Sequence, residues 1–396
     1  MKKALLIGLV TIFLVEPTFA APKNIQVKKI EIVMAANNAE GLILSGKNII
    51  TFANTPSPNA NAVVTAIDAA GGSQWVRTID SGSDEVVTAA SVDSLGNIWL
   101  AGSSAPIVAA ETATALSNVE NPDGVIQEPV ATIRPDLTQL TVWKLSPLGE
   151  LLATYISSQT APGLVNAVSV NASGVSLVGQ LNGRPFLLSA SLLGEFGKII
   201  YLGTEKTQVN ALLRMPDGSI NLFGSSTEKL AGKKLVGSQD GFLMKVGKSG
   251  AITSVVRSSA PKATRSWLAA DTNLTLTGFV KSGKIMESAF TKFNTTFTPT
   301  WTIRVPSLGK SVVAVAPNTT YGAINSQSAI KGLNGWKPTT PSLLILAFDA
   351  KGVISGGYGS SDLVAPISLA YSREIGVIGL AMASDKSVSI FRLSTR

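Results

Sequence analysis

Lysine and arginine side chains offer most of the chemistry in this sequence, because two other reactive residue types are missing. The 396 residues include 33 Lys and Arg against 25 Asp and Glu, a formal net charge of +8, and contain no His and no Cys. The lack of His excludes His-based triads, His-mediated proton transfer and nearly all zinc, copper and non-haem iron sites. We therefore expect no metal and no other cofactor.

Basic side chains gather between the apolar runs, where the pattern predicts exposed loops. A row of cations would attract an anionic polymer, and an aromatic ring among them could stack on a sugar. The alternative is that these lysines are simply solvated. The predicted ligand-binding residues are Arg184, Lys229, Lys233, Lys234, Lys281, Lys284, Lys331, Trp336 and Lys337, and Lys262 and Arg265 add two charges nearby.

Carboxylates are concentrated elsewhere in the chain. Asp84 and Glu85 lie at a predicted blade connection, but neighbours on a strand point to opposite faces and make a poor acid/base couple. A hydrolase or lyase acting on extracellular carbohydrate is therefore only an alternative. An acidic flap is also predicted, which could meet a protein partner. It comprises Glu111, Glu120, Asp123, Glu128 and Asp136 within the insertion 103–140.

An internal repeat of strands and tight turns must position these side chains. One form is a strand, a turn and a strand closed by Gly, as in VDSLGNIWLAGSS (92–104) and LRMPDGSINLFGSS (213–226). A second strand pair, such as TVWKLSPLGELLATYI (141–156), follows each copy of the first. Units recur roughly every 45 to 55 residues, which is typical of propeller blades. The sequence therefore predicts an all-β, seven-bladed β-propeller with four-stranded blades.

The two ends of the chain complete this prediction. The last unit stops one strand short, so a spare strand at 25–33 is expected to complete the last blade and close the ring. Residues 1–20 have the basic start, apolar run and small-residue end of a signal peptide cleaved near Ala20. One propeller domain over 21–396 is expected outside the cytoplasm, in the periplasm, at the cell surface or secreted.

Two blades carry a resemblance to a known family. Asp93, Gly96, Asn97 and Gly102 occupy one strand-turn-strand unit, and Asp240, Phe242, Lys245 and Gly250 occupy another. These residues are similar to the Asp-x-x-Gly-Asn turn and the Asp-x-Phe-x-x-Lys strand of the secreted bacterial β-propeller repeat family. The resemblance implies the fold and export, and no particular activity.

The turn from Asp93 to Asn97 could be read as a calcium loop, but it offers one carboxylate where Ca²⁺ takes about six or more oxygen ligands. We interpret it as a turn in which the Asp side chain binds its own backbone and Gly supplies a positive φ. Trp99, just after it, is expected to pack between blades.

Strand direction assigns the loops to two faces of the ring. The tight turns fall on one face, here the turn face, and the insertions 103–140, 225–241 and 324–341 fall on the other, the loop-rich face. A channel-mouth ring of small polar residues is predicted on the loop-rich face. These groups suit a sugar or water, or else satisfy the backbone of the next blade. They are Thr88, Asn166, Asn210, Thr264 and Ser311.

Long amphipathic side chains recur in the predicted outer strands. They could form a track for nucleic acid, but we prefer edge protection, because bulky and charged residues block sheet-to-sheet association. The column is Arg77, Tyr155, Tyr201, Arg257, Arg304 and Tyr358.

These observations favour a non-catalytic binding or scaffold propeller. Its expected ligand is an anionic polymer or glycan of the cell surface, held by the basic loops. A protein partner on the insertion 103–140 is a further alternative. We expect a monomer with no nucleic-acid specificity and, after removal of residues 1–20, no membrane span.

Overall fold

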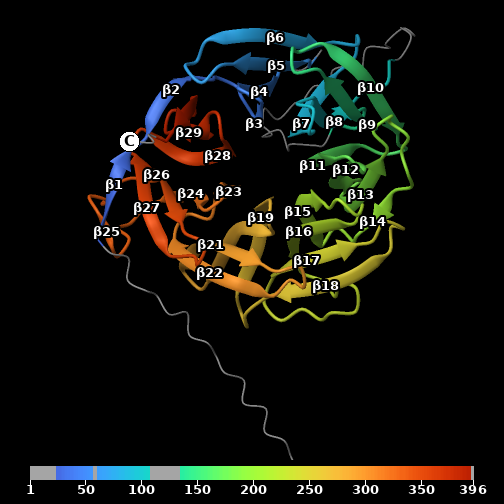
Figure 1. The fold of residues 1–396 in the computed structure, drawn as a ribbon. Coiled ribbons are helices and arrows are strands. Elements are labelled where there is room, and N and C mark those ends of the chain that lie inside the picture. Colours follow the sequence, from blue (N-terminus) through green and yellow to red (C-terminus); the bar gives the residue numbers. More distant parts are fainter. Residues whose placement is uncertain (1–23, 57–59, 108–133, 394–396) are drawn as a thin grey trace, which may run out of the picture.

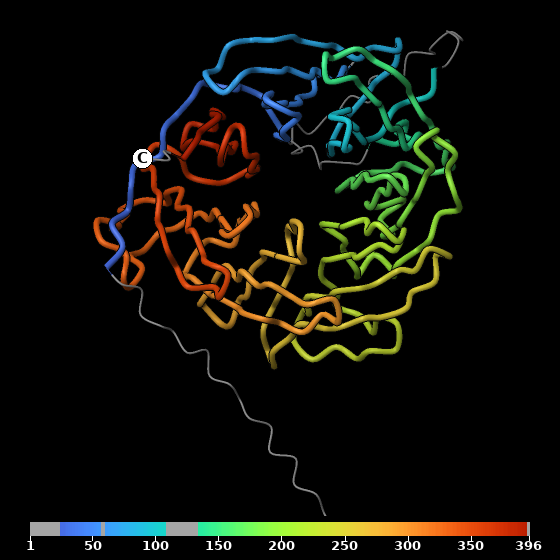
Figure 2. The backbone as a smooth tube through the Cα atoms, in the orientation of Figure 1, coloured from blue at the N-terminus to red at the C-terminus, as the bar shows by residue number. Residues whose placement is uncertain are grey.

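Strands arranged around a central axis make up the protein (Figure 1, Figure 2). The computed structural model describes residues 24–56, 60–107 and 134–393, and within these ranges every regular element is a strand. Each sheet runs from an innermost strand near the axis to an outermost strand at the circumference. The fold is all-β, as the sequence predicts.

Six sheets in the described ranges are four-stranded blades with antiparallel neighbours. From the inner strand outward they are β3 (Gly41–Ser45), β4 (Asn48–Asn54), β5 (Ala62–Ile67) and β6 (Ser73–Ile79); β7 (Glu85–Val92), β8 (Ile98–Ser104), β9 (Gln139–Leu145) and β10 (Leu151–Ser158); β11 (Gly163–Asn171), β12 (Gly174–Leu181), β13 (Arg184–Ala190) and β14 (Ile200–Tyr201); β15 (Thr207–Arg214), β16 (Ile220–Ser226), β17 (Asp240–Val246) and β18 (Ile252–Ser258); β19 (Thr264–Asp271), β20 (Thr275–Ser282), β21 (Ile285–Phe293) and β22 (Pro299–Pro306); and β28 (Leu363–Ser372), β29 (Gly376–Ala383), β30 (Val388–Arg392) and β2 (Glu31–Ala35).

The remaining sheet is larger. It has six strands in the order β23 (Ser311–Val315), β24 (Thr320–Ser326), β26 (Ser342–Phe348), β27 (Ile354–Ser360), β1 (Ile25–Lys29) and β25 (Leu333–Asn334). The prediction of seven four-stranded blades is therefore wrong: six blades have that form, and this sheet gains two strands. Sequence periodicity did not assign β1 and β25 to this sheet, because both strands come from outside the repeated strand pairs.

The N-terminal segment explains the larger sheet. β1 pairs in parallel with β27, for example Val27 with Gly357, and after Ile30 the chain continues as β2, which pairs with β30. Only Glu31–Ala35 supplies the outer strand of the sheet β28–β30, where the sequence predicted the whole of 25–33. One continuous segment thus connects two neighbouring sheets across the closure of the ring.

The apolar core lies between neighbouring sheets. Every residue of β8, β16 and β26 is buried, because these middle strands are covered on both faces. One cluster joins Trp99 and Leu140 of one blade to Phe186 of the next. Another joins Phe223 of the blade β15–β18 to Trp267 of the blade β19–β22. Adjacent blades therefore stabilise each other by burying apolar surface.

A β-bulge in the innermost strand recurs near the axis. The bulge presses its backbone against the second strand, and an added Cβ at Gly224 would overlap the carbonyl oxygen of Gln208. This close approach explains why Gly closes the second strand of the repeat. The extra residues are Thr88, Asn166, Asn210 and Leu268, and the opposing glycines are Gly102, Gly179, Gly224 and Gly278.

Gly224→Ala should lower the free energy of unfolding by about 1–3 kcal/mol or more, because the new methyl group must displace main chain. The control is Gly197→Ala, where the nearest atom to an added Cβ is the Ser189 carbonyl oxygen at 3.5 Å. Thermal midpoints of the two variants provide the measurement. Equal midpoints would contradict the role assigned to the bulge.

Candidate functional site

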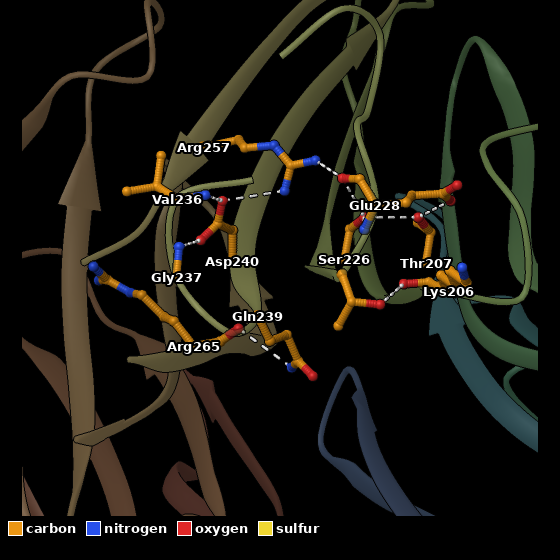
Figure 3. Close-up of polar contacts among 11 residues, drawn as sticks. Lys206, Thr207, Ser226, Glu228, Val236, Gly237, Gln239, Asp240, Arg257 and Arg265 are labelled. Atoms are coloured by element: carbon orange, nitrogen blue, oxygen red, sulfur yellow. Dashed lines mark hydrogen bonds and ion pairs between the residues drawn. The ribbon is translucent and has the colours of Figure 1, made fainter. Parts of the chain in front are cut away.

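The loop between β16 and β17 carries three of the predicted lysines, and a buried ion pair anchors it (Figure 3). The Arg257 guanidinium lies 3.3 Å from the Asp240 carboxylate, with the two side chains 6% and 0% exposed. Arg257 also donates to the Glu228 carbonyl. Asp240 accepts the backbone N–H groups of Val236 and Gly237, at 3.0 and 2.8 Å. Both ends of the loop are thus held by one pair of side chains.

The same loop is attached to the next blade by main-chain hydrogen bonds. The Ser238 N–H donates to the Ala263 carbonyl at 2.8 Å, and the Arg265 N–H donates to the Gln239 carbonyl at 2.9 Å. Gln239 and Thr264 form an isolated parallel bridge. Because backbone bonds fix its course, the loop needs little further ordering to bind a ligand.

Exposed lysines project from this anchored frame. All seven predicted lysines are solvent-exposed, and among the residues that the structure describes none of them forms an ion pair. Lys233 lines a groove of about 380 Å³ along the outermost strand β18, together with Ile252–Val256. Lys281 and Lys284 lie at the tip of the β20–β21 hairpin. The predicted cations are therefore available to solvent.

The insertion 324–341 turns toward the circumference. Its short strand β25 pairs with β1, Ile25 opposite Leu333, and forms the outer edge of the six-stranded sheet. Lys331 and Lys337 flank this edge in the sequence. The basic groups of this insertion thus belong to the outer rim of the ring, away from the central channel.

Trp336 does not provide a stacking surface. It is 8% exposed, belongs to a core cluster with Ile330 and Phe348, and donates its indole N–H to the Ser326 hydroxyl at 3.1 Å. The expectation was wrong because the flanking lysines suggested exposure, whereas the insertion folds back and needs an apolar anchor. An exposed cation over an aromatic ring occurs elsewhere: the Arg184 guanidinium lies 4.1 Å from the Tyr201 ring centroid.

The central channel contains part of the predicted polar ring. Residues of the innermost strands β3, β7, β11, β15, β19, β23 and β28 line a cavity of about 370 Å³. Thr88, Asn166 and Asn210 are among them, whereas Thr264 and Ser311 are not. Leu268 occupies the bulge position where Thr264 was expected. Counting back from the turn failed there because this blade has fewer residues between its bulge and its turn than the others.

The three predicted polar residues that do line the channel connect adjacent blades. Each lies at a bulge, and each donates a hydrogen bond to the main-chain carbonyl of the residue just before the bulge of the next blade. The alternative in which these groups satisfy a neighbouring backbone is therefore the one observed. The bonds are Thr88 to Val165 at 2.6 Å, Asn166 to Val209 at 2.8 Å and Asn210 to Trp267 at 2.7 Å.

The two candidate acids point inward. Asp84 is 7% exposed, pairs with Arg134 and accepts the Ala60 N–H at 3.0 Å. Glu85 is 1% exposed and accepts hydrogen bonds from Ser81. Burial raises the pKa of Glu85, although the Ser81 hydrogen bonds oppose this. These carboxylates do not form the accessible couple that the hydrolase alternative requires.

The turn at Asp93 has the structural role that the sequence predicts. Its carboxylate accepts the N–H groups of Leu95 and Asn97 and the indole N–H of Trp99, at 2.9, 3.0 and 2.9 Å. Burial alone would raise the pKa of Asp93, but these hydrogen bonds outweigh it and lower the pKa. Trp99 is fully buried between blades and stacks on Tyr155, so that prediction is confirmed.

The outer column is less uniform than predicted. Arg77 donates to the Gly149 carbonyl at 2.7 Å and Tyr155 to the Leu192 carbonyl at 3.4 Å, so each contacts a turn of the next blade. Arg257 is a buried anchor and does not protect an edge. The sequence analysis named its partner Asp240 only as a motif residue and missed the ion pair, although an acid at the end of a long insertion could have suggested an anchor.

Some predictions lie outside the described residues. These are the signal peptide at 1–20 and most of the acidic flap, residues 108–133. In the ranges that are described, no three or more acidic side chains come together in a way that could hold a metal ion. Nor do those ranges form any helix with the length and hydrophobicity needed to cross a membrane.

The radial four-stranded sheets, the closed ring and the central channel together define a β-propeller. No family model and no curated protein matches the sequence. Similar solved structures are the WD40 propeller of Doa1 (8% identity, 93% of this chain and 98% of that chain, TM-score 0.54), the WD40 domain of Toxoplasma gondii coronin (12%, 93% and 83%, 0.51) and the propeller domain of the Trilobed protease from Pyrococcus furiosus (6%, 91% and 96%, 0.50). At these identities the likeness shows the fold alone.

Asn166→Ala and Asn210→Ala should each destabilise the protein by about 1–3 kcal/mol, because a carbonyl at a blade boundary loses its donor. Thr264→Ala is the control, since this residue lies outside the channel and its backbone bridge survives the change. Chemical unfolding of the three variants provides the comparison. A control as destabilised as the Asn variants would refute the assignment.

Glu85→Gln should raise the thermal midpoint at pH 7, because the folded state then no longer holds a buried charge. A carboxyl whose pKa is raised by folding contributes most below its unfolded pKa of about 4.3, and this contribution is lost as the pH rises. The advantage of the variant should therefore vanish below about pH 4. The control is Glu195→Gln at an exposed turn, which should show no such pH-dependent gain.

Proposed function

We propose that this protein is a binding module that holds an anionic polymer or glycan along the outer rim of the loop-rich face. The observation that carries the proposal is the set of seven exposed lysines without ion-pair partners among the described residues. We further propose that residues 1–20 direct the protein out of the cytoplasm, where such polymers occur at the cell surface.

An extended ligand suits this arrangement better than a compact one. The lysines come from the connections β16–β17, β20–β21 and β24–β26, which belong to three consecutive sheets. Exposed charges act over about 8 Å at physiological salt, so each contributes little by itself. A polymer that contacts several sheets gathers these contributions, and its binding should weaken as salt rises.

The test is a four-residue charge reversal, with Glu replacing Lys233, Lys234, Lys284 and Lys337. Retention on dextran sulfate, on polygalacturonate and on isolated cell envelope should fall about tenfold or more, a loss of ~1.4 kcal/mol, because attraction becomes repulsion. Uncharged dextran should retain neither protein.

The matched control reverses four exposed lysines of the turn face, Lys47, Lys198, Lys248 and Lys351. Both variants lower the formal net charge from +8 to 0, so they differ only in the face that is changed. The control should retain binding. Equal losses in both variants would mean that net charge alone acts, and unchanged binding in the first would sink the proposal.

A further inference from the structure

Arg265 differs from the other cations of the loop-rich face because its side chain is enclosed. Its backbone is tied to Gln239, and Figure 3 shows the guanidinium directed away from these contacts. The guanidinium lies 4.5 Å from the ring centroid of Trp267. Gly241 of the preceding blade lies against both, since a Cβ there would be 3.1 Å from Trp267 Nε1 and 3.4 Å from Arg265 Cγ.

No acceptor among the described residues satisfies this guanidinium. Its Nε is buried and makes no hydrogen bond, and the buried Nε1 of Trp267 is in the same situation. Burial, with repulsion from Arg304, lowers the pKa of Arg265 to about 10, so the group still carries its charge at pH 7. A desolvated charge without a partner is costly, and proteins usually supply a counter-ion. Arg257, one blade away, has its counter-ion in Asp240.

Strand register brings a second guanidinium to the same side of the sheet. Trp267 lies opposite Gly278, and the register continues through Ala289 to Arg304, so these residues share one face. The two residues between Trp267 and Arg304 in this row, Gly278 and Ala289, are small and buried. Within the described residues Arg304 has one acidic partner, Glu287, at the long distance of 3.9 Å. Positive charge therefore exceeds negative charge on this face.

We infer that Arg265, with Arg304 beside it, binds an oxyanion group of the polymer, a carboxylate or a sulfate or phosphate ester. This rests on the proposed function for the identity of the ligand, but the site can be tested without the polymer. The residue keeps a partly exposed surface, so a ligand group can reach it. The planar fork of Arg matches two oxygens of an oxyanion, and the Trp267 ring holds that plane in place. Low dielectric makes such a contact stronger than any exposed lysine contact.

The experiment measures the thermal midpoint of the full chain in sodium glucuronate, sulfate, phosphate or chloride at equal ionic strength. At least one oxyanion should raise the wild-type midpoint above its value in chloride, following ligand linkage. Arg265→Gln should lower the apparent affinity about tenfold or more. In chloride this variant should be at least as stable as the wild type, because an enclosed unpaired charge has gone. General salting effects cancel in the difference between the two proteins.

Two further variants complete the design. Arg265→Lys keeps the charge without the fork, and it should fold and show a reduced oxyanion response even if Arg265→Gln fails to fold. Arg373→Gln removes an exposed cation at the β28–β29 connection on the turn face, and its response should equal the wild type. Equal oxyanion responses in the wild type and both Arg265 variants would overturn the inference. A wild type indifferent to oxyanions, together with an Arg265→Gln protein that is less stable than the wild type in chloride, would also overturn it.

The outcomes also separate this inference from the proposed function. A response to glucuronate alone identifies a carboxylate ligand, and a response to sulfate or phosphate identifies a tetrahedral ester; either supports the site. An Arg265-dependent response without retention on any polymer would refute the polymer proposal and leave the oxyanion site standing. If the lysine reversal removes polymer retention and the Arg265 variants have no effect, the polymer proposal stands and the oxyanion site is refuted.

Discussion

Near the axis, three neighbouring blade boundaries are each crossed by one side-chain hydrogen bond of the same kind. The extra residue of an inner-strand bulge donates to the carbonyl just before the next bulge, as Asn166 does to Val209 and Asn210 to Trp267. The bulge and the bond depend on each other, because the bulge disrupts the local ladder and the neighbouring side chain supplies a donor there. The opposing glycine, such as Gly224, is needed because the bulged backbone leaves no room for a Cβ at that position. Inner strands held in this way set the spacing of β7, β11, β15 and β19, and hence the position of the loops at the ends of their sheets.

The loop-rich face combines two kinds of positive charge. Exposed lysines attract anions at a distance and are screened by salt, so they favour encounter more than tight binding. Arg265 is enclosed against Trp267, where a contact is short-range and strong. The buried Arg257–Asp240 pair brings the two kinds of charge together. It anchors the lysine-bearing loop, and the backbone of that loop is hydrogen-bonded to Arg265 near the start of β19. Rigid placement of exposed charge and partial burial of one further cation are the physical basis of the proposed binding.

Patterns that depend on near neighbours in the chain were predictable. The Asp93 turn, the burial of Trp99 and the exposure of the loop lysines follow from turn chemistry, repeat position and charge. Predictions that needed a register were partly right: Asn166 and Asn210 line the channel, but Thr264 does not, since one blade has a shorter hairpin. Predictions that needed a partner from elsewhere were wrong. Trp336 is buried because its insertion folds back onto the sheet, and Arg257 is buried because it pairs with the buried Asp240, two residues before its cross-strand neighbour Phe242.

The sequence by itself determined the all-β class, the strand-turn repeat and the face on which the insertions lie, because alternation of side chains and turn residues act over a few positions. Tertiary structure alone decided how the ring closes and which cations are enclosed. β1 and β2 divide one segment between two sheets, and no periodicity marks that division. In the sequence, Arg265 and Lys262 are both loop cations with nothing to distinguish their exposure. Only the packing of Gly241 and Trp267 against Arg265 withdraws its side chain from water.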